Sequence, residues 1–329
     1  MSVVGPTYRL VRGRSAVEGP PSLDDAQRLV VDHEGGPLLV LAGPGTGKTT
    51  TLVEAIAQRI ADGARPDEVL ALTFSRKAAE QLRTRVTARV GRTMSASLGS
   101  TFHSFAYGLV REHSLPELYD APLRLLSAPE QDVVLQQILT TAPESVTWPD
   151  SVRGAIGTRG FAGEVAQVLA RAQEKGLGFE ALRRLGEQEG LPEFVAAAAF
   201  MEQYDIVTAD QNLLDYPGLI ATAVRMLQDP DHPLREDLRA RYAHVFVDEY
   251  QDTDPAQVAM LQAIAGDGRD LVVVGDPHQS IYGFRGAEVR GILEFPQRFP
   301  GRDGSPADTV VLGTTRRFGS RILRAAQSV

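Results

Sequence analysis

The sequence predicts an α/β fold, in which a parallel β-sheet carries helices on both faces and is interrupted by an inserted helical subdomain. Short apolar runs rich in Val and Leu have the length of buried strands, and segments with helical periodicity separate them. Strand-like runs disappear between residues 106 and 205. With 329 residues and 43% hydrophobic content, the chain can bury one large core and a smaller core beside it.

Five segments are expected to form strands of this sheet. They are residues 37–43, 69–74, 244–249, 271–276 and 309–313. Helical patterns at residues 48–60 and 76–90 follow the first two strands, and this alternation favours parallel pairing. Ligands of such sheets bind at the carboxyl ends of the strands. We therefore expect the functional residues to follow the strands.

Composition divides the chain into three regions. Residues 1–21 are rich in Gly and Pro and are predicted to form an extended N-terminal arm. Residues 22–105 and 206–329 are predicted to form the sheet domain. Between them, residues 106–205 are dominated by Ala, Leu, Gln, Glu and Arg at helical spacing, which predicts a helical insertion.

Composition also disfavours several classes of protein. The chain has no Cys and six scattered His, which excludes disulfides and thiolate chemistry and disfavours a zinc site. No apolar run approaches membrane-spanning length, and the N-terminus lacks the apolar stretch of a signal peptide, so we expect a cytoplasmic protein with no membrane partner. The net charge of −8 argues against a broadly basic nucleic-acid-binding surface. A local patch at residues 76–92, with six basic residues and one acid, is the exception.

A phosphate-binding loop, AGPGTGKT, is predicted after the first strand. Small residues let backbone N–H groups turn toward phosphate oxygens at a helix N-terminus, while Lys48 supplies a positive charge and Thr49 a hydroxyl for Mg²⁺. The predicted nucleotide contacts of this segment are Ala42, Gly43, Gly45, Thr46, Gly47, Lys48, Thr49 and Thr50. The usual pattern has Gly at the position of Ala42, and the alternative interpretation is a Gly-rich turn without a ligand.

Two acids follow the predicted strand HVFV and suit the chemistry of a phosphate loop. Asp248 is expected to hold Mg²⁺, and Glu249 to orient and deprotonate an attacking water. An Asp-Glu pair after a strand is also a common helix start with a favourable dipole interaction, which is the alternative. The nearby phosphate loop favours the catalytic interpretation.

Two more side chains are candidates for the nucleotide site. Gln27 lies at the start of a predicted helix that Ser22 is expected to cap, and its alternative is a solvated side chain. Arg317, in the segment TTRRFGS, is expected to neutralise charge that develops on a γ-phosphate. Its alternative is a surface Arg.

Eight ordered segments resemble one family, the superfamily 1A DNA helicases of the UvrD, Rep and PcrA type. They are LDDAQ, AGPGTGKTTTL, VLALTFSRKAAEQLRTRV, GSTFHSFA, LLDYPGLI, VFVDEYQDTDPAQ, VGDPHQSIYGFRGAE and VVLGTTRRFGSRIL. DEYQDT followed by GDPHQSIYGFRGA distinguishes this family from kinases, GTPases and transporter ATPases. The resemblance implies a RecA-like P-loop NTPase domain that uses ATP and Mg²⁺ and moves 3′ to 5′ on single-stranded DNA.

The resemblance also implies roles for residues of the nucleotide site. The family's phosphate, Mg²⁺ and water-activating residues fall on positions already identified, Lys48, Thr49, Asp248 and Glu249. Gln27 corresponds to the residue that contacts adenine, and Arg317 to the first arginine finger. Gln279 corresponds to the γ-phosphate sensor.

The implied DNA contacts are Phe74, His103, Tyr282, Phe284 and Arg285. Aromatic faces that stack on bases, with a cation beside them, are the usual composition of a single-strand site. Gln279 lies three residues before Tyr282, so we expect this loop to couple the ATP state to the strand. The alternatives are a core position for Phe74 and a structural hydrogen-bonding role for His103.

Three positions depart from the family pattern. Phe284 replaces the usual Trp, which gives a smaller stacking platform. Arg316 replaces the aromatic residue that stacks on adenine, and this puts nucleotide selectivity in doubt, although an Arg plane also stacks on bases. Thr50 replaces a residue that is often basic.

The resemblance covers the first motor lobe and its insertion, so we expect translocation to require a second lobe. The N-terminal arm and the run FAGEVAQVLARAQEKGLGFEALRRLG resemble actinobacterial two-motor helicase–nucleases, which implies a partner subunit. The leading hypothesis is the ATP- and DNA-binding half of a helicase that acts on single strands and duplex junctions. A nucleotide-sensing or partner-docking module without turnover is the second hypothesis, and a small-molecule kinase is the third.

Overall fold

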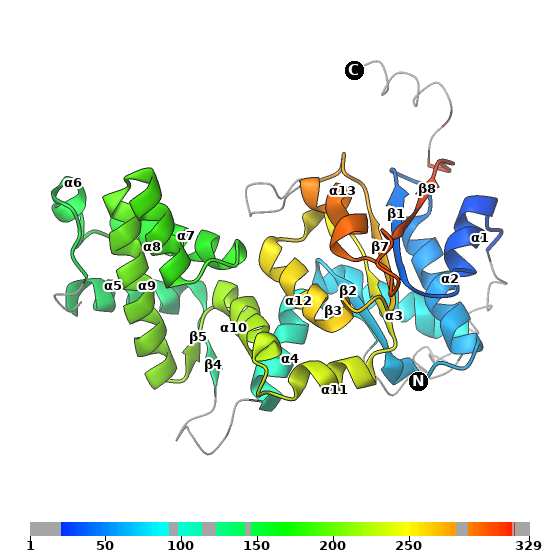
Figure 1. Ribbon diagram of the computed structural model, residues 1–329, viewed down its shortest axis with the longest axis horizontal. Helices are drawn as coiled ribbons and strands as arrows, with labels where there is room; N and C mark the ends of the chain where they lie inside the picture. Colours follow the sequence, from blue (N-terminus) through cyan, green and yellow to red (C-terminus); the bar gives the residue numbers. More distant parts are fainter. Residues whose placement is uncertain are drawn as a thin grey trace, which may run out of the picture.

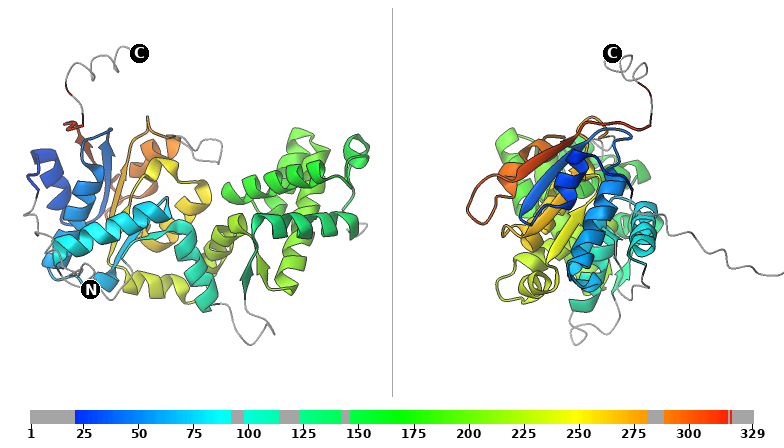
Figure 2. Two further views of the ribbon diagram at one scale, coloured as in Figure 1. Left: turned by 180° about the vertical axis from the view of Figure 1, so that it is seen from behind. Right: turned by 90° about the vertical axis from the view of Figure 1, so that its right-hand side faces the viewer.

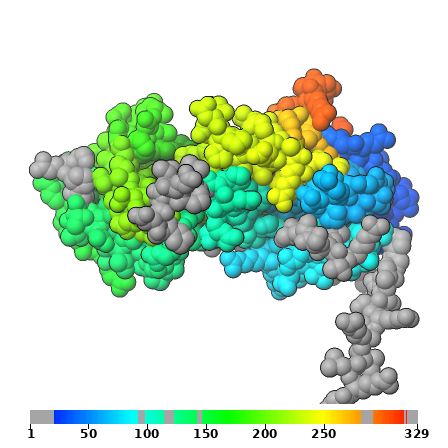
Figure 3. All heavy atoms as spheres, turned by 90° about the horizontal axis from the view of Figure 1, so that it is seen from below, coloured from blue at the N-terminus to red at the C-terminus, as the bar shows by residue number. Residues whose placement is uncertain are grey.

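The computed structural model describes residues 21–91, 98–113, 123–141, 146–280, 289–317 and 319. The molecule is elongated, with a sheet domain at one end and a group of helices at the other (Figure 1). Seen from below, the helical end and the sheet end form one continuous body (Figure 3). The predicted fold class is confirmed, because a parallel sheet carries helices on both faces.

Six strands build the sheet. Their bounds are β1 Pro37–Ala42, β2 Val69–Thr73, β3 Ser100–Thr101, β6 His244–Val247, β7 Asp270–Gly275 and β8 Asp308–Leu312. They lie in the order β3-β2-β6-β7-β1-β8, and every neighbouring pair is parallel. The five predicted strands are all present, and β3 adds a short edge strand. The carboxyl ends of the strands therefore meet at one edge of the sheet.

Alternating side chains along the strands build two cores, one on each face of the sheet. Leu38 and Val40 of β1 belong to one core, and Leu39 belongs to the other. The first core is covered by α1 Asp25–Val31, α2 Lys48–Ala61 and α3 Arg76–Val90. The second is covered by α4 Phe102–His113, α10 Tyr216–Gln228, α11 Leu234–Arg241, α12 Pro255–Ala265 and α13 Val289–Arg298.

Helix α1 begins at a different cap from the one predicted. Asp24, not Ser22, is the N-cap, because its carboxylate accepts a hydrogen bond from the Gln27 backbone N–H at 2.9 Å. The Gln27 side-chain oxygen accepts one from the Asp24 N–H at 3.1 Å. This reciprocal pair needs a spacing of three residues, which Asp24 has and Ser22 lacks.

A third core lies within the helical end of the molecule. Its helices are α5 Ala128–Thr141, α6 Asp150–Arg153, α7 Arg159–Glu174, α8 Phe179–Glu189 and α9 Pro192–Asp210. Trp148 and Phe200 pack in this core. Helix α4 packs in the sheet domain instead, although residues 106–113 fall within the predicted insertion.

A short two-stranded parallel sheet joins the two ends of the molecule. It pairs β4 Arg124–Leu125 with β5 Leu213–Leu214. Strand β4 lies between residues 106 and 205, where no strand was predicted, because two residues are too few to show an alternating pattern. Figure 2 shows the molecule from behind, with the helical end in green, and from the side of the sheet domain. Among the described residues, no helix is both long enough and apolar enough to span a membrane.

Candidate functional site

The phosphate-loop segment connects β1 to α2. Gly45 and Gly47 have φ angles of 75° and 92°, a left-handed conformation that favours Gly. A Cβ atom on Gly47 would also lie 2.6 Å from the Gln27 side-chain nitrogen. Helix α2 begins at Lys48, and its N-cap, Gly47, provides no side-chain acceptor for the N–H groups of the first turn. The loop therefore has the conformation and the donors that suit a phosphate group.

The two predicted acids follow β6, directly beside the loop. The Lys48 ammonium nitrogen lies 3.1 Å from a Glu249 carboxylate oxygen, although the residues are 201 positions apart. Glu249 has a φ of 54°, and Asn212 is the other non-glycine residue with a positive φ in the described part of the chain. Backbone of this kind persists where the surroundings over-determine it, which often occurs at functional sites.

Asp248 differs from Glu249 in its surroundings. Asp248 is buried, and its carboxylate accepts a hydrogen bond from the Glu249 N–H at 3.0 Å. Burial, with the charge of Glu249, raises the pKa of Asp248 to about 6, while Lys48 opposes this shift. A buried carboxylate of this kind favours a nearby cation.

A buried glutamine links the acids to the next strand. Gln251 donates to a Glu249 carboxylate oxygen at 2.8 Å and accepts from the Asp276 N–H at 2.9 Å. Asp276 in turn accepts a hydrogen bond from the Gln279 side chain at 2.5 Å. Gln251 and Asp276 lie in motifs that carry the family resemblance, but neither residue was predicted to belong to the site. Their signal was the spacing within DEYQDT and GDPHQ.

The segment after β8 packs onto the phosphate loop. The Arg316 N–H donates to the Gly45 carbonyl at 2.9 Å, and the Thr315 hydroxyl donates to the Pro44 carbonyl at 2.9 Å. These contacts hold Arg316 and Arg317 over the loop.

A pocket of about 600 Å³ lies between the loop, the acids and this segment. Its lining consists of Pro44, Gly45, Gly47, Lys48, Thr49, Thr50, Arg85, Glu249, Gln279, Arg316 and Arg317. Four cations face one carboxylate, which is the charge balance that a polyanion needs. Arg85, from α3, was recognised in the sequence as part of a basic patch but not as a nucleotide-site residue. Five predicted nucleotide-site residues do not line the pocket: Gln27, Ala42, Gly43, Thr46 and Asp248.

Two of the predicted DNA contacts meet in a second pocket, of about 310 Å³. Phe74 and His103 line it together with Tyr216. The His103 and Tyr216 rings are stacked, with centroids 4.1 Å apart and planes 9° apart, and Tyr216 is 48% exposed. Tyr216 was missed as a candidate, although it lies in the quoted segment LLDYPGLI. Tyr282, Phe284 and Arg285 lie outside the described residues.

Acids also line the second pocket, among them Asp254. Asp254 is the N-cap of α12, and its carboxylate accepts a hydrogen bond from the Gln257 N–H at 2.8 Å. Burial raises the pKa of Asp254 to about 7, and the neighbouring Glu174 adds to the shift. The Gln257 and Ala256 N–H groups and the Lys175 charge oppose it.

Comparison with known proteins identifies the family of this chain. Residues 23–300 match the family described as the UvrD/REP helicase N-terminal domain. The chain belongs to this family. Relatives in it include DNA helicase II of Escherichia coli K12, which is 30% identical over 310 residues that cover 94% of this chain and 40% of the relative.

Two mycobacterial members of the UvrD/REP family are also similar. ATP-dependent DNA helicase UvrD1 of Mycobacterium tuberculosis H37Rv is 33% identical over 319 residues, which cover 93% of this chain and 39% of the relative. ATP-dependent DNA helicase UvrD2 of the same strain is 36% identical over 289 residues, which cover 84% and 39%. The chain thus spans about two fifths of the length of these UvrD-type relatives.

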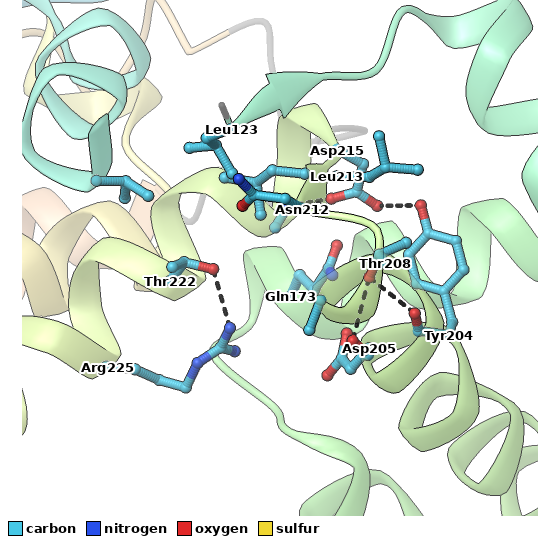
Figure 4. Close-up of a pocket in the computed structure, with 14 residues that line it drawn as sticks. Leu123, Gln173, Tyr204, Asp205, Thr208, Asn212, Leu213, Asp215, Thr222 and Arg225 are labelled. Atoms are coloured by element: carbon cyan, nitrogen blue, oxygen red, sulfur yellow. Dashed lines mark hydrogen bonds between the residues drawn. The ribbon is translucent and has the colours of Figure 1, made fainter. Parts of the chain in front are cut away.

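In this UvrD/REP-family chain, Asp215 directly precedes α10 and connects the start of this helix to the helical end of the molecule. Its carboxylate accepts hydrogen bonds from the Gly218 N–H at 2.7 Å, the Tyr204 hydroxyl at 3.1 Å and the Gln131 amide at 2.8 Å. Figure 4 shows Asp215 and Tyr204 at the edge of a pocket of about 230 Å³. Burial raises the pKa of Asp215. Because Tyr216 follows directly, this anchor also fixes the start of the helix that carries its ring.

Proposed function

We propose that this chain is the ATP- and single-stranded-DNA-binding first lobe of an ATP-dependent DNA helicase that works in the cytoplasm. The observation that carries the proposal is the contact of Lys48 with Glu249, 3.1 Å long, in a pocket lined by four cations. It brings a phosphate-loop cation to a carboxylate that follows a different strand. The 3′-to-5′ direction of movement rests on the resemblance described above.

The residues beside Lys48 fit a Mg²⁺ ion. Asp248 and Glu249 place two carboxylates near one ammonium group, and Thr49 adds a hydroxyl at the first turn of α2. A bound divalent cation would offset the charge of these two carboxylates and would polarise the phosphates. Thr49 and Asp248 would hold the cation, Glu249 would accept the proton of the attacking water, and Arg317 would neutralise charge on the γ-phosphate.

Gln251 and Asp276 support a coupling role for Gln279. They form a continuous set of hydrogen bonds from Glu249 to Gln279, each between 2.5 and 2.9 Å. Any movement of Glu249 on hydrolysis therefore changes the support of the loop that leads to the proposed DNA contacts Tyr282 to Arg285. This is the element through which the ATP state reaches the DNA strand.

The pocket of Phe74, His103 and Tyr216 is proposed to bind a base of the strand. A stacked aromatic pair with an exposed outer ring suits a base face, and such stacking contributes about 1–3 kcal/mol per base. The acids that line this pocket repel phosphates. They therefore favour entry of a base over entry of the backbone.

Titration of a labelled single-stranded oligonucleotide into the full chain, at two salt concentrations, tests the DNA site. Replacing Tyr216 with Leu is expected to weaken binding about tenfold, from the loss of one stacked base. Tyr107→Leu, on α4 and outside the pocket lining, is the matched control. Equal affinities of the Tyr216 variant and the control would contradict the base-binding role.

Turnover is tested by adding a separately produced second lobe and measuring DNA-stimulated phosphate release. The helicase proposal predicts stimulation by single strands and by duplex junctions. If the chain binds nucleotide and DNA but no pairing releases phosphate, the nucleotide-sensing or partner-docking module is favoured instead. The same mixtures reveal whether a further partner subunit is required.

A further inference from the structure

We propose that Arg316, and not Gln27, reads the nucleobase in this chain, and that the site accepts guanine nucleotides at least as well as adenine nucleotides. This inference rests on the proposed function, because it concerns the base of the triphosphate held by Lys48. It depends on three features: the saturated amide oxygen of Gln27, the lining of the pocket and the donors of Arg316.

The Gln27 amide oxygen has no capacity for a ligand. It accepts hydrogen bonds from the Asp24 N–H at 3.1 Å and from the Arg316 guanidinium at 3.1 Å. A carbonyl oxygen has two lone pairs, so both are used. The amide nitrogen donates to the Thr46 carbonyl at 3.2 Å. Gln27 therefore supports the phosphate loop and closes the capping box of α1.

The position of Gln27 agrees with its hydrogen bonds. Gln27 is 0% exposed and does not line the pocket, whereas Arg316 does. The Arg316 side chain, which is 47% exposed, binds the Gln27 oxygen from the side of the pocket. A base attached to a triphosphate at Lys48 thus meets the guanidinium before it can reach the amide.

The guanidinium of Arg316 offers donors only. One N–H group binds Gln27, and another contacts the Asp24 carboxylate at 3.4 Å. The described part of the chain leaves the remaining N–H groups available to a base. Guanine presents two acceptors, O6 and N7, on one edge, and Arg recognises this edge with two hydrogen bonds. Adenine presents an amino group in place of O6, and neither Arg316 nor the saturated Gln27 oxygen accepts a hydrogen bond from it. The surface that meets the base is therefore complementary to guanine.

Competition binding tests this assignment. A fluorescent ribose-labelled ATP analogue is displaced from the full chain by ATP, by GTP and by tripolyphosphate, which has no base. We expect GTP to bind as tightly as ATP or more tightly. A dissociation constant for GTP up to about threefold above that of ATP still counts as equal, since one hydrogen bond changes affinity about tenfold. ATP that binds more than about threefold more tightly than GTP would overturn the proposal.

Three variants isolate the role of Arg316. Arg316→Leu frees the Gln27 oxygen and is expected to shift the ATP-to-GTP preference about tenfold toward ATP. Arg316→Lys keeps the positive charge, so it is expected to shift the preference while tripolyphosphate affinity is retained. Arg184→Leu, on the exposed face of α8, is the matched control with no shift. An unchanged preference in Arg316→Leu would also overturn the assignment.

The proposed function fails separately from this inference. If the ATP analogue itself does not bind to the full chain, the chain does not bind triphosphates, and both ideas are wrong. If ATP and tripolyphosphate bind but GTP binds weakly, the nucleotide site stands and only the role of Arg316 is wrong.

Discussion

Replacing Asp254 with Asn is expected to stabilise the protein above neutral pH. Asp254 is buried, and its pKa is raised from 3.8 to about 7. A raised pKa means that the folded protein binds the proton more tightly than the unfolded chain does. The contribution of Asp254 to stability is therefore fully present below pH 3.8 and is lost as the pH rises to about 7.

The size of this effect follows from the shift. About three pKa units correspond to about 4 kcal/mol of destabilisation at pH 8, at 1.36 kcal/mol per unit, before relaxation of the surroundings reduces it. Asn keeps an oxygen that accepts the Gln257 N–H, so the cap of α12 is retained without the charge. We expect the variant to be more stable than the wild type by about 1–4 kcal/mol at pH 8, and by much less at pH 4.

Thermal unfolding from pH 4 to pH 8 measures this difference. The melting temperature of Asp254→Asn is expected to exceed that of the wild type by about 2–8 °C at pH 8, at roughly 2 °C per kcal/mol. Asp25→Asn, at a side chain that is 99% exposed, is the matched control for the change from Asp to Asn. The reasoning is refuted if the difference between wild type and Asp254→Asn is the same at every pH, or if the variant is the less stable protein at pH 8.

Three further substitutions test the contacts around the two pockets. Gln251→Leu leaves a buried backbone N–H without its acceptor, and we expect a loss of about 1–3 kcal/mol in chemical denaturation; an unchanged midpoint would show that this contact is dispensable. Asp215→Ala removes three hydrogen bonds next to Tyr216 and is expected to weaken single-strand binding while nucleotide affinity stays constant. A parallel loss of both affinities would count against a local role of Asp215. Gly45→Ala is expected to weaken nucleotide binding at least about tenfold, because φ is 75° and the added atom meets the segment after β8. Gly190→Ala is the control, because Gly190 has a similar φ of 66° in open space, and it should leave nucleotide affinity unchanged.

Local patterns were sufficient to predict the sheet and the phosphate loop. Strand β1 has an apolar run with a phosphate-loop sequence directly after it, and both signals lie within a few residues. The five predicted strands are also separated by long helices, which leaves parallel pairing as the simple solution. Strand β4 was not predictable in this way, because two residues of backbone pairing leave no pattern.

The environment of each site residue depended on contacts between distant segments. Arg316 lies 289 positions from Gln27, so no local pattern indicates that its guanidinium donates a hydrogen bond to the Gln27 amide oxygen. Tyr216 and His103 meet only after the chain has passed through the whole helical end. The raised pKa of Asp254 likewise depends on burial and on the charge of Glu174, at the end of α7, which sequence spacing does not reveal.

The most direct test of the nucleotide site is a titration of a fluorescent triphosphate, with Mg²⁺ present, into the wild type and into Lys48→Ala. Lys77→Ala, an exposed position on α3, is the matched control. We expect the wild type and Lys77→Ala to saturate with the same dissociation constant, and Lys48→Ala to lose at least about tenfold in affinity, or about 1.4 kcal/mol. Equal affinity of Lys48→Ala and the wild type would contradict the assignment of this pocket to a nucleoside triphosphate.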